Sequence, residues 1–130
     1  NKRIKNVRTV NDWLTRDETV VDEYNAGKLT TFLFTVNGYR GLMNMILYVR
    51  KPRNIERIPK NLPMLMISGL DDPVGEYGKG VYRAYNSYHD HIDDIDLRLY
   101  EDCRHELCNE LNKEEIYEEI YGWIMNHMSK

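Results

Sequence analysis

An apolar run that ends abruptly in acidic residues constrains the fold of this chain more than any other feature. Residues 63–68 are almost wholly apolar, and Gly-Leu-Asp-Asp-Pro follows at once at residues 69–73. A short apolar run bounded by glycine and proline is typical of a strand buried on both faces, as in a parallel sheet. Open α/β sheets bind ligands and hold reactive groups at the carboxyl ends of such strands. We therefore expect Asp71 and Asp72 to lie at a functional edge of the sheet.

A second predicted strand also ends next to residues that can do chemistry. Residues 95–100 alternate strictly between apolar and polar side chains, which is typical of a strand with one covered face. A predicted helix over residues 73–91 separates the two strands, and strands that alternate with helices pair in parallel. The carboxyl ends of parallel strands share one edge, so the sequence predicts that Asp72 meets His105 there. A carboxylate beside an imidazole is how a general base is held to activate a nucleophile.

The rest of the chain is predicted to be mainly helical. Thr15 and Glu18 have the spacing of a capping box at the start of a first helix, and residues 30–35 form either a brief strand or an aromatic loop. The apolar stripe of a helix over residues 39–50 either packs in the core or lines a lipid pocket. Asn112 is expected to cap a final helix whose apolar side is buried.

Composition limits the classes of protein and partner that fit this chain. With 130 residues, 42% of them hydrophobic, it has the size and the core of one domain. Its formal net charge of -3 gives no reason to expect a nucleic-acid partner, and no apolar run approaches the roughly 20 residues of an integral membrane segment. Cys103 and Cys108 are expected to be free thiols in a reducing compartment, which favours a cytoplasmic location.

Two predicted strands are too few for a stable parallel sheet, because an isolated pair leaves an apolar strand with an open edge. We therefore expect either the C-terminal part of a larger fold or a non-catalytic interaction module that forms a homo-oligomer through this edge. A separate possibility is a metal site made by His89-Asp90-His91 with the aspartates at 93 and 94. Because polar residues collect at turns and helix ends anyway, we expect no metal there.

Both chemistry-bearing loops resemble segments of a known superfamily, the α/β-hydrolases. Residues 64–75 (MLMISGLDDPVG) are similar to its acid-bearing strand and turn, and residues 99–110 (LYEDCRHELCNE) are similar to its histidine loop. The resemblance is to the monoacylglycerol lipase and lysophospholipase-like group, also described as serine aminopeptidase-like. It implies that the catalytic acid is Asp72, in preference to Asp71, and that the catalytic base is His105.

The chain departs from this family at the nucleophile. The family uses a serine in a G-x-S-x-G turn between a strand and a helix, and no serine of this chain stands in that setting. The resemblance therefore implies the C-terminal part of an α/β-hydrolase fold, with residues 1–58 forming lid helices and a linker, and residues 59–130 carrying the acid and histidine loops. It implies a serine hydrolase that cleaves carboxylic esters of lipid type, such as lysophospholipids or monoacylglycerols, without a cofactor. The chain alone is expected to be inactive, because it lacks the attacking serine.

Overall fold

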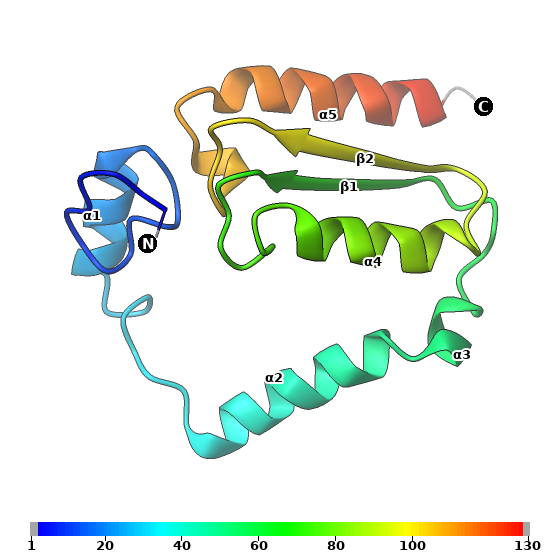
Figure 1. Cartoon of the computed structure of the whole chain (residues 1–130), viewed down its shortest axis with the longest axis horizontal. Helices are drawn as coiled ribbons and strands as arrows, with labels where there is room; N and C mark the ends of the chain where they lie inside the picture. The colour runs from blue at the N-terminus through cyan, green and yellow to red at the C-terminus, as the bar shows by residue number, and fades with distance from the viewer. Residues whose placement is uncertain (1–2, 129–130) are drawn as a thin grey trace.

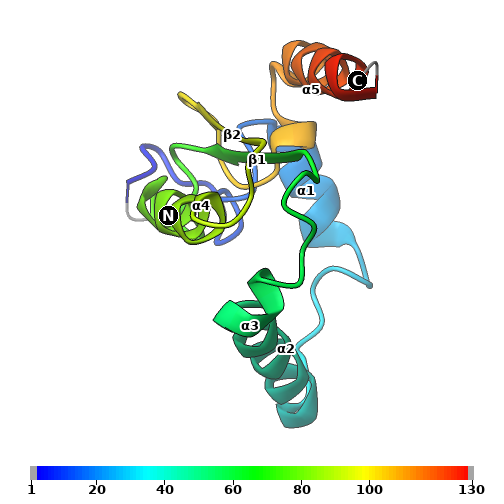
Figure 2. The same ribbon diagram turned by 90° about the vertical axis from the view of Figure 1, so that its right-hand side faces the viewer.

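The computed structural model describes residues 3–128, in which two parallel strands lie among helices. Figure 1 shows the strands side by side, with α4 and α5 on either side and both arrowheads pointing toward the N-terminal segment. Figure 2 also shows the strands between α4 and α5. The elements in chain order are α1 Glu18–Ala26, α2 Val36–Val49, α3 Pro52–Ile55, β1 Met64–Gly69, α4 Lys79–His89, β2 Ile95–Tyr100, the 3₁₀ turn η1 Leu107–Asn109 and α5 Lys113–Met128.

The sheet within residues 3–128 is the predicted parallel pair, β1 and β2. Met64 lies opposite Ile95 and Gly69 lies opposite Tyr100, so the two strands end at the same edge. The prediction that β1 is buried on both faces is met only in part. Of its residues only Ser68 and Gly69 are buried, because one neighbouring strand leaves the other edge of β1 uncovered.

A buried hydrophobic cluster joins the segment after β2 to α5. Its members and the partly buried residues packed against them are Cys103, Leu107, Ile116, Ile67, Tyr100 and Ile120. The predicted apolar side of α5 is confirmed at Ile116, which is fully buried, whereas Ile124 remains 42% exposed. The cluster therefore anchors the segment that follows β2, and this segment carries His105.

The helix after β1 begins later than the sequence predicts. Residues 73–78 form turns, and α4 starts only at Lys79. Glu76 and Tyr77 have φ angles of 52° and 57°, and Gly78 has a φ of 82°. A residue in this left-handed region cannot continue a right-handed helix. The turn between β1 and α4 therefore remains part of the edge where the two strands end.

The side chains of two predicted helix caps have partners in distant segments of the chain. The cap of α1 is Asp17, whose Oδ1 accepts hydrogen bonds from Thr19 N at 2.9 Å and Val20 N at 3.4 Å. Thr15, the predicted cap, is fully buried, and its hydroxyl donates to the carbonyl of Asn109 at 2.7 Å. Asn112, the predicted cap of α5, directs its Oδ1 toward Arg16 Nη2 at 2.6 Å. Both side chains are engaged across the fold, because distant segments offer them partners.

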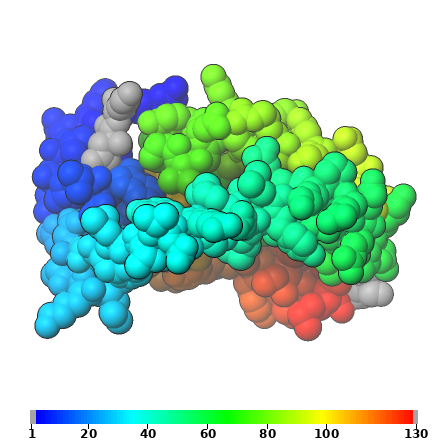
Figure 3. Space-filling model, turned by 90° about the horizontal axis from the view of Figure 1, so that it is seen from below, coloured from blue at the N-terminus to red at the C-terminus, as the bar shows by residue number. Residues whose placement is uncertain are grey.

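Helix α2 lies apart from the sheet, as both ribbon views show (Figures 1 and 2). It begins at Val36 because Thr35 Oγ1 caps it, accepting from Gly38 N at 3.1 Å. None of its residues is buried, so the first of the two alternatives, core packing, is wrong for the residues that the structure describes. Residues 30–35 form a loop, in which Phe32 and Phe34 are exposed and contact each other edge-on. Figure 3 shows the segment around α2 and α3 crossing one face of the molecule.

Candidate active site

Asp72 and His105, which are distant along the chain, are in contact at the common edge of the two strands. The Oδ2 atom of Asp72 lies 3.1 Å from Nδ1 of His105. The Asp72 side chain is 7% exposed, whereas that of His105 is 38% exposed. The predicted meeting of these two residues is therefore confirmed as a contact. Asp72 is shielded by protein, whereas His105 is accessible to a reactant.

The close approach of the two loops depends on a glycine. A Cβ atom at Gly69 would lie 2.1 Å from the carbonyl oxygen of Cys103 and 2.3 Å from that of Arg104. Asp71 N donates to the carbonyl of Cys103 at 2.9 Å, and Leu70 N donates to that of Tyr100 at 2.9 Å. The turn that carries Asp72 and the loop that carries His105 are thus joined through backbone atoms. This close contact fixes the position of the two side chains relative to each other.

The two adjacent aspartates have different surroundings. Asp72 is buried, and its Oδ1 accepts a hydrogen bond from Val74 N at 2.8 Å, which leaves Oδ2 directed to His105. Asp71 is exposed. A backbone hydrogen bond that holds one oxygen orients the whole carboxylate. The geometry therefore favours Asp72, in agreement with the choice made from the sequence.

The contact with Asp72 leaves the other ring nitrogen of His105 available. In the neutral tautomer with its proton on Nδ1, the imidazole donates to Asp72, and the unprotonated Nε2 can accept a proton. The indole of Trp13 lies beside the imidazole, with ring centroids 5.1 Å apart and planes inclined at 50°. The arrangement can orient an imidazole, balance its charge when it is protonated and offer Nε2 as a general base.

Other polar residues hold the histidine loop in place. Asn109 Nδ2 donates to Glu106 Oε2 at 2.8 Å, a contact within the loop. Glu110 is fully buried, and its Oε1 accepts from Arg104 N at 2.7 Å. The family resemblance extends to the segments that hold Glu110 and Trp13, but it gave neither residue a role. Only their partners in the fold distinguish them from an ordinary surface acid and an ordinary core aromatic residue.

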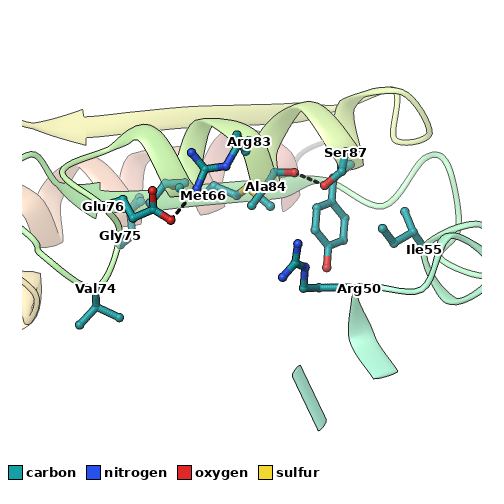
Figure 4. A pocket seen from close by; sticks show the side chains of 13 residues that line it. Arg50, Ile55, Met66, Val74, Gly75, Glu76, Arg83, Ala84 and Ser87 are labelled. Carbon is teal, nitrogen blue, oxygen red and sulfur yellow. Dashed lines mark hydrogen bonds and ion pairs between the residues drawn. The ribbon is translucent and has the colours of Figure 1, made fainter. Parts of the chain in front are cut away.

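A cavity of about 660 Å³ lies beside the sheet but does not include Asp72 or His105. It is bounded by β1, α4, the end of α2 and α3, and Figure 4 shows Arg50 and Ile55 facing α4 across it. Residues of α4 and of the turn before it line the opposite side, where Arg83 pairs with Glu76. This cavity contains neither member of the acid–imidazole pair, so we do not assign the reaction to it.

The structure offers no support for the alternative metal site. Within residues 3–128, no group of histidine, cysteine, aspartate or glutamate side chains is arranged to hold a metal ion. His91 lies near a backbone carbonyl instead, with its Nε2 2.8 Å from the oxygen of Ile58. Cys103 and Cys108 are free thiols, as predicted. No helix in the described part of the chain has the length and hydrophobicity needed to cross a membrane.

Comparison with known proteins finds one matching family and solved structures with a similar fold. The family model described as serine aminopeptidase, S33, matches residues 2–112. A thermostable carboxyl esterase from Bacillus coagulans, solved in complex with glycerol, is 25% identical, with a TM-score of 0.79 over 98% of this chain. A lipase in an open form is 21% identical, with a TM-score of 0.83, and shows likeness of fold alone.

The chain spans about two fifths of the length of these two solved structures, 41% of the esterase and 42% of the lipase. No curated protein matches it. The predicted fold class is confirmed, since two parallel strands alternate with helices and both solved structures superpose on nearly the whole chain.

Proposed function

The chain belongs to the serine aminopeptidase S33 family of α/β-hydrolases, and from this premise we propose that it carries the acid and the base of a serine hydrolase that cleaves carboxylic esters. The observation that carries the proposal is the 3.1 Å contact between Asp72 and His105 at the carboxyl edge of two parallel strands. The likeness to a carboxyl esterase supports ester cleavage in particular.

In the proposed mechanism His105 acts first as a base and then as an acid. Its Nε2 takes the proton from a serine hydroxyl as the serine oxygen attacks the ester carbonyl, and then returns a proton to the leaving alcohol. Water repeats the cycle on the acyl-enzyme. Asp72, shielded from solvent, keeps the proton of the neutral ring on Nδ1 and stabilises the imidazolium that forms. The steps need no metal and no organic cofactor.

The nucleophile of this mechanism is proposed to lie outside these residues. Ser68 lies at the end of β1, where its hydroxyl is 3.4 Å from the carbonyl of Gly69, and Ser87 donates within α4 to the carbonyl of Ala84. Neither stands in a turn between a strand and a following helix, and Ser129 lies outside the described residues. We therefore propose that this chain alone is inactive and that the complete enzyme supplies the serine.

Residues 1–58 are proposed to form the lid region and its linker, and residues 59–130 the C-terminal part of the catalytic core. Within the lid region, α2 has an exposed apolar side that includes Leu42, Met43 and Ile46. Such a surface suits contact with an acyl chain, and methionine adapts to ligands of different shape. This exposure supports a lipid-type ester, such as a lysophospholipid or a monoacylglycerol, as substrate.

A fluorophosphonate probe, which reacts with activated serines, tests this function on the full-length protein. We expect labelling of the natural protein and a loss of about 10⁴-fold or more in labelling rate for His105→Ala. His89→Ala is the matched control, because His89 is an exposed histidine at the end of α4. Undiminished labelling of His105→Ala would overturn the assignment of the base.

A second candidate function is self-association without catalysis. Within the described residues β1 pairs only with β2, and an uncovered strand edge is a template for pairing with another chain. We expect light scattering on the isolated chain to report a dimer if this edge drives self-association. A clean monomer would remove the reason for this second proposal.

A further inference from the structure

We propose that Glu110 and Trp13 are positioning residues for His105, and that they act through a set of contacts that we call the histidine clasp. The clasp consists of Trp13, Arg16, Arg104 and Glu110, and it joins the N-terminal segment to the histidine loop. The proposal rests on the proposed role of His105 as the catalytic base. Glu110 acts through the backbone of the histidine loop, and Trp13 acts through the imidazole ring of His105. Neither is therefore proposed as a catalytic residue.

Glu110 is the centre of the clasp. Its side chain is fully buried, yet both oxygens have donors. Oε1 accepts from Arg104 N at 2.7 Å, directly next to His105 in the chain, and Oε2 accepts from Arg16 Nε at 2.8 Å. A buried carboxylate is tolerated only when it is paired and hydrogen-bonded. Glu110 therefore fixes the backbone of the residue before His105 to an arginine from the other end of the chain.

The two arginines of the clasp use their charge in different ways. Burial opposes the charge of Arg16, but the hydrogen bond with Glu110 and its negative charge outweigh this effect and raise the pKa of Arg16. Arg104 Nη1 donates to the carbonyls of Asp12 at 2.6 Å and Thr15 at 2.9 Å. The ion pair of Arg16 with Glu110 joins the N-terminal segment to the histidine loop. The side chain of Arg104 joins the same two segments by donating to backbone carbonyls of the N-terminal segment.

The N-terminal segment in turn holds His105 itself. His105 N donates to the carbonyl of Trp13 at 3.4 Å, and Glu106 N donates to that of Leu14 at 2.7 Å. The Trp13 indole lies beside the imidazole, with the ring centroids 5.1 Å apart. The contact with Asp72 restrains only one atom of the ring, so a second surface is needed to limit its rotation. Trp13 supplies that surface, and the Glu110–Arg16 pair holds the segment that carries Trp13.

This arrangement places control of the catalytic base partly outside the catalytic core. Trp13 and Arg16 belong to residues 1–58, the proposed lid region, whereas Arg104 and Glu110 belong to the histidine loop. A displacement of about 1 Å at a reacting group can lower the rate about 100-fold. A loosened clasp is therefore expected to lower kcat while KM, which depends on the pocket walls, changes little.

The test measures the ring tautomer of His105 in the full-length protein. Long-range ¹H–¹⁵N NMR correlations distinguish a proton on Nδ1 from one on Nε2, and the His105 signal is assigned by its loss in His105→Asn. We expect the Nδ1–H form in the natural protein, and a mixture of tautomers in Glu110→Gln and in Trp13→Ala. Trp13→Phe, which keeps a flat ring, is expected to restore most of the Nδ1–H form.

The control variant is Glu119→Gln, which removes the same charge from an exposed side chain that pairs with Arg98 and accepts from Tyr100 but is not a member of the clasp. It is expected to leave the tautomer unchanged. In ester hydrolysis, Glu110→Gln and Trp13→Ala are expected to lower kcat by about 10-fold to 100-fold, with KM within about twofold. If Glu110→Gln does not fold, Trp13→Ala decides the question by the same two measurements.

Failure of the positioning proposal and failure of the proposed hydrolase function would give different results. A folded Trp13→Ala that retains the Nδ1–H form and its kcat would overturn the positioning proposal, whatever the enzyme cleaves. If the tautomer responds as expected but no fluorophosphonate labels the natural protein, the clasp stands and the hydrolase function fails.

Discussion

The histidine loop and helix α2 differ in how each is held. The histidine loop includes Cys103 and Glu110, both fully buried, and is tied to β1 and to the N-terminal segment by backbone and side-chain hydrogen bonds. In α2 no residue is buried, although the helix is the more apolar of the two regions. The geometry of the Asp72–His105 pair therefore depends on short segments with partners within the chain, whereas α2 presents an apolar surface.

Replacement of Gly69 should disturb the well-held region most. We expect Gly69→Ala to lower the free energy of unfolding by about 3 kcal/mol or more, because its Cβ would overlap the carbonyl oxygens of Cys103 and Arg104. Gly122→Ala in α5 is the matched control, since a Cβ there meets nothing within 4 Å. The control should stabilise the protein by about 0.5–1 kcal/mol. Urea unfolding measures both, and equal effects would contradict the stated role of Gly69.

A pair of isoleucine substitutions compares the two regions directly. Ile116→Ala removes a fully buried side chain from the cluster under the histidine loop and should cost about 2–5 kcal/mol. Ile46→Ala in α2, where the side chain is 38% exposed, should cost less than about 1 kcal/mol. Both are measured by urea unfolding. A large loss in the α2 variant would show that its apolar side is covered in solution.

The two free cysteines should differ in their rates of reaction with a thiol reagent, and this difference can be measured without destabilising the protein. Burial, together with the nearby charge of Glu110, raises the pKa of the Cys103 thiol, whereas Cys108 is exposed. Because the thiolate is the reactive form, Cys108 should react with a thiol reagent at least about 10-fold faster than Cys103. Mass spectrometry of each labelled peptide over time measures the two rates. Comparable rates would mean that the cluster around Cys103 opens readily.

Alkaline pH should produce the smallest change. Burial and a hydrogen bond to Glu119, at 2.9 Å, raise the pKa of Tyr100 to about 12. A raised folded-state pKa gives stability that is fully present below the unfolded value of about 10 and is lost as pH rises through about 12. The free energy of unfolding should therefore fall with pH less steeply in Tyr100→Phe than in the natural protein over this interval. Tyr82→Phe, at an exposed tyrosine, should keep the natural slope.

Features set by local sequence patterns could be predicted from the sequence. The apolar run and the alternating run gave both strands, and the rule that such strands pair in parallel brought Asp72 to His105. The catalytic role of the two residues is still a prediction, and it comes from the family resemblance. The open edge of β1 also followed from the sequence, since only two strands could be found in it.

Features set by distant partners could not be predicted. Thr15 has the spacing of a helix cap, but Asn109, 94 residues away, accepts its hydrogen bond. Glu110 resembles any surface acid until Arg16 and Arg104 surround it. Glu76 and Tyr77 adopt left-handed conformations that no periodicity indicates, so the sequence pattern predicts too early a start for α4. For α2 the pattern revealed an apolar stripe but not what covers it.

We propose that Asp72, rather than its neighbour Asp71, orients His105 as the base of an ester hydrolase. The most direct test is the kcat of the full-length protein on a lipid-type ester, compared between Asp72→Asn and Asp71→Asn. Asp72 is buried against His105 and Asp71 is exposed, so we predict a loss of about 10⁴-fold for the first variant and less than about threefold for the second. Equal losses in the two variants, or full activity of Asp72→Asn, would show that Asp72 does not have this role.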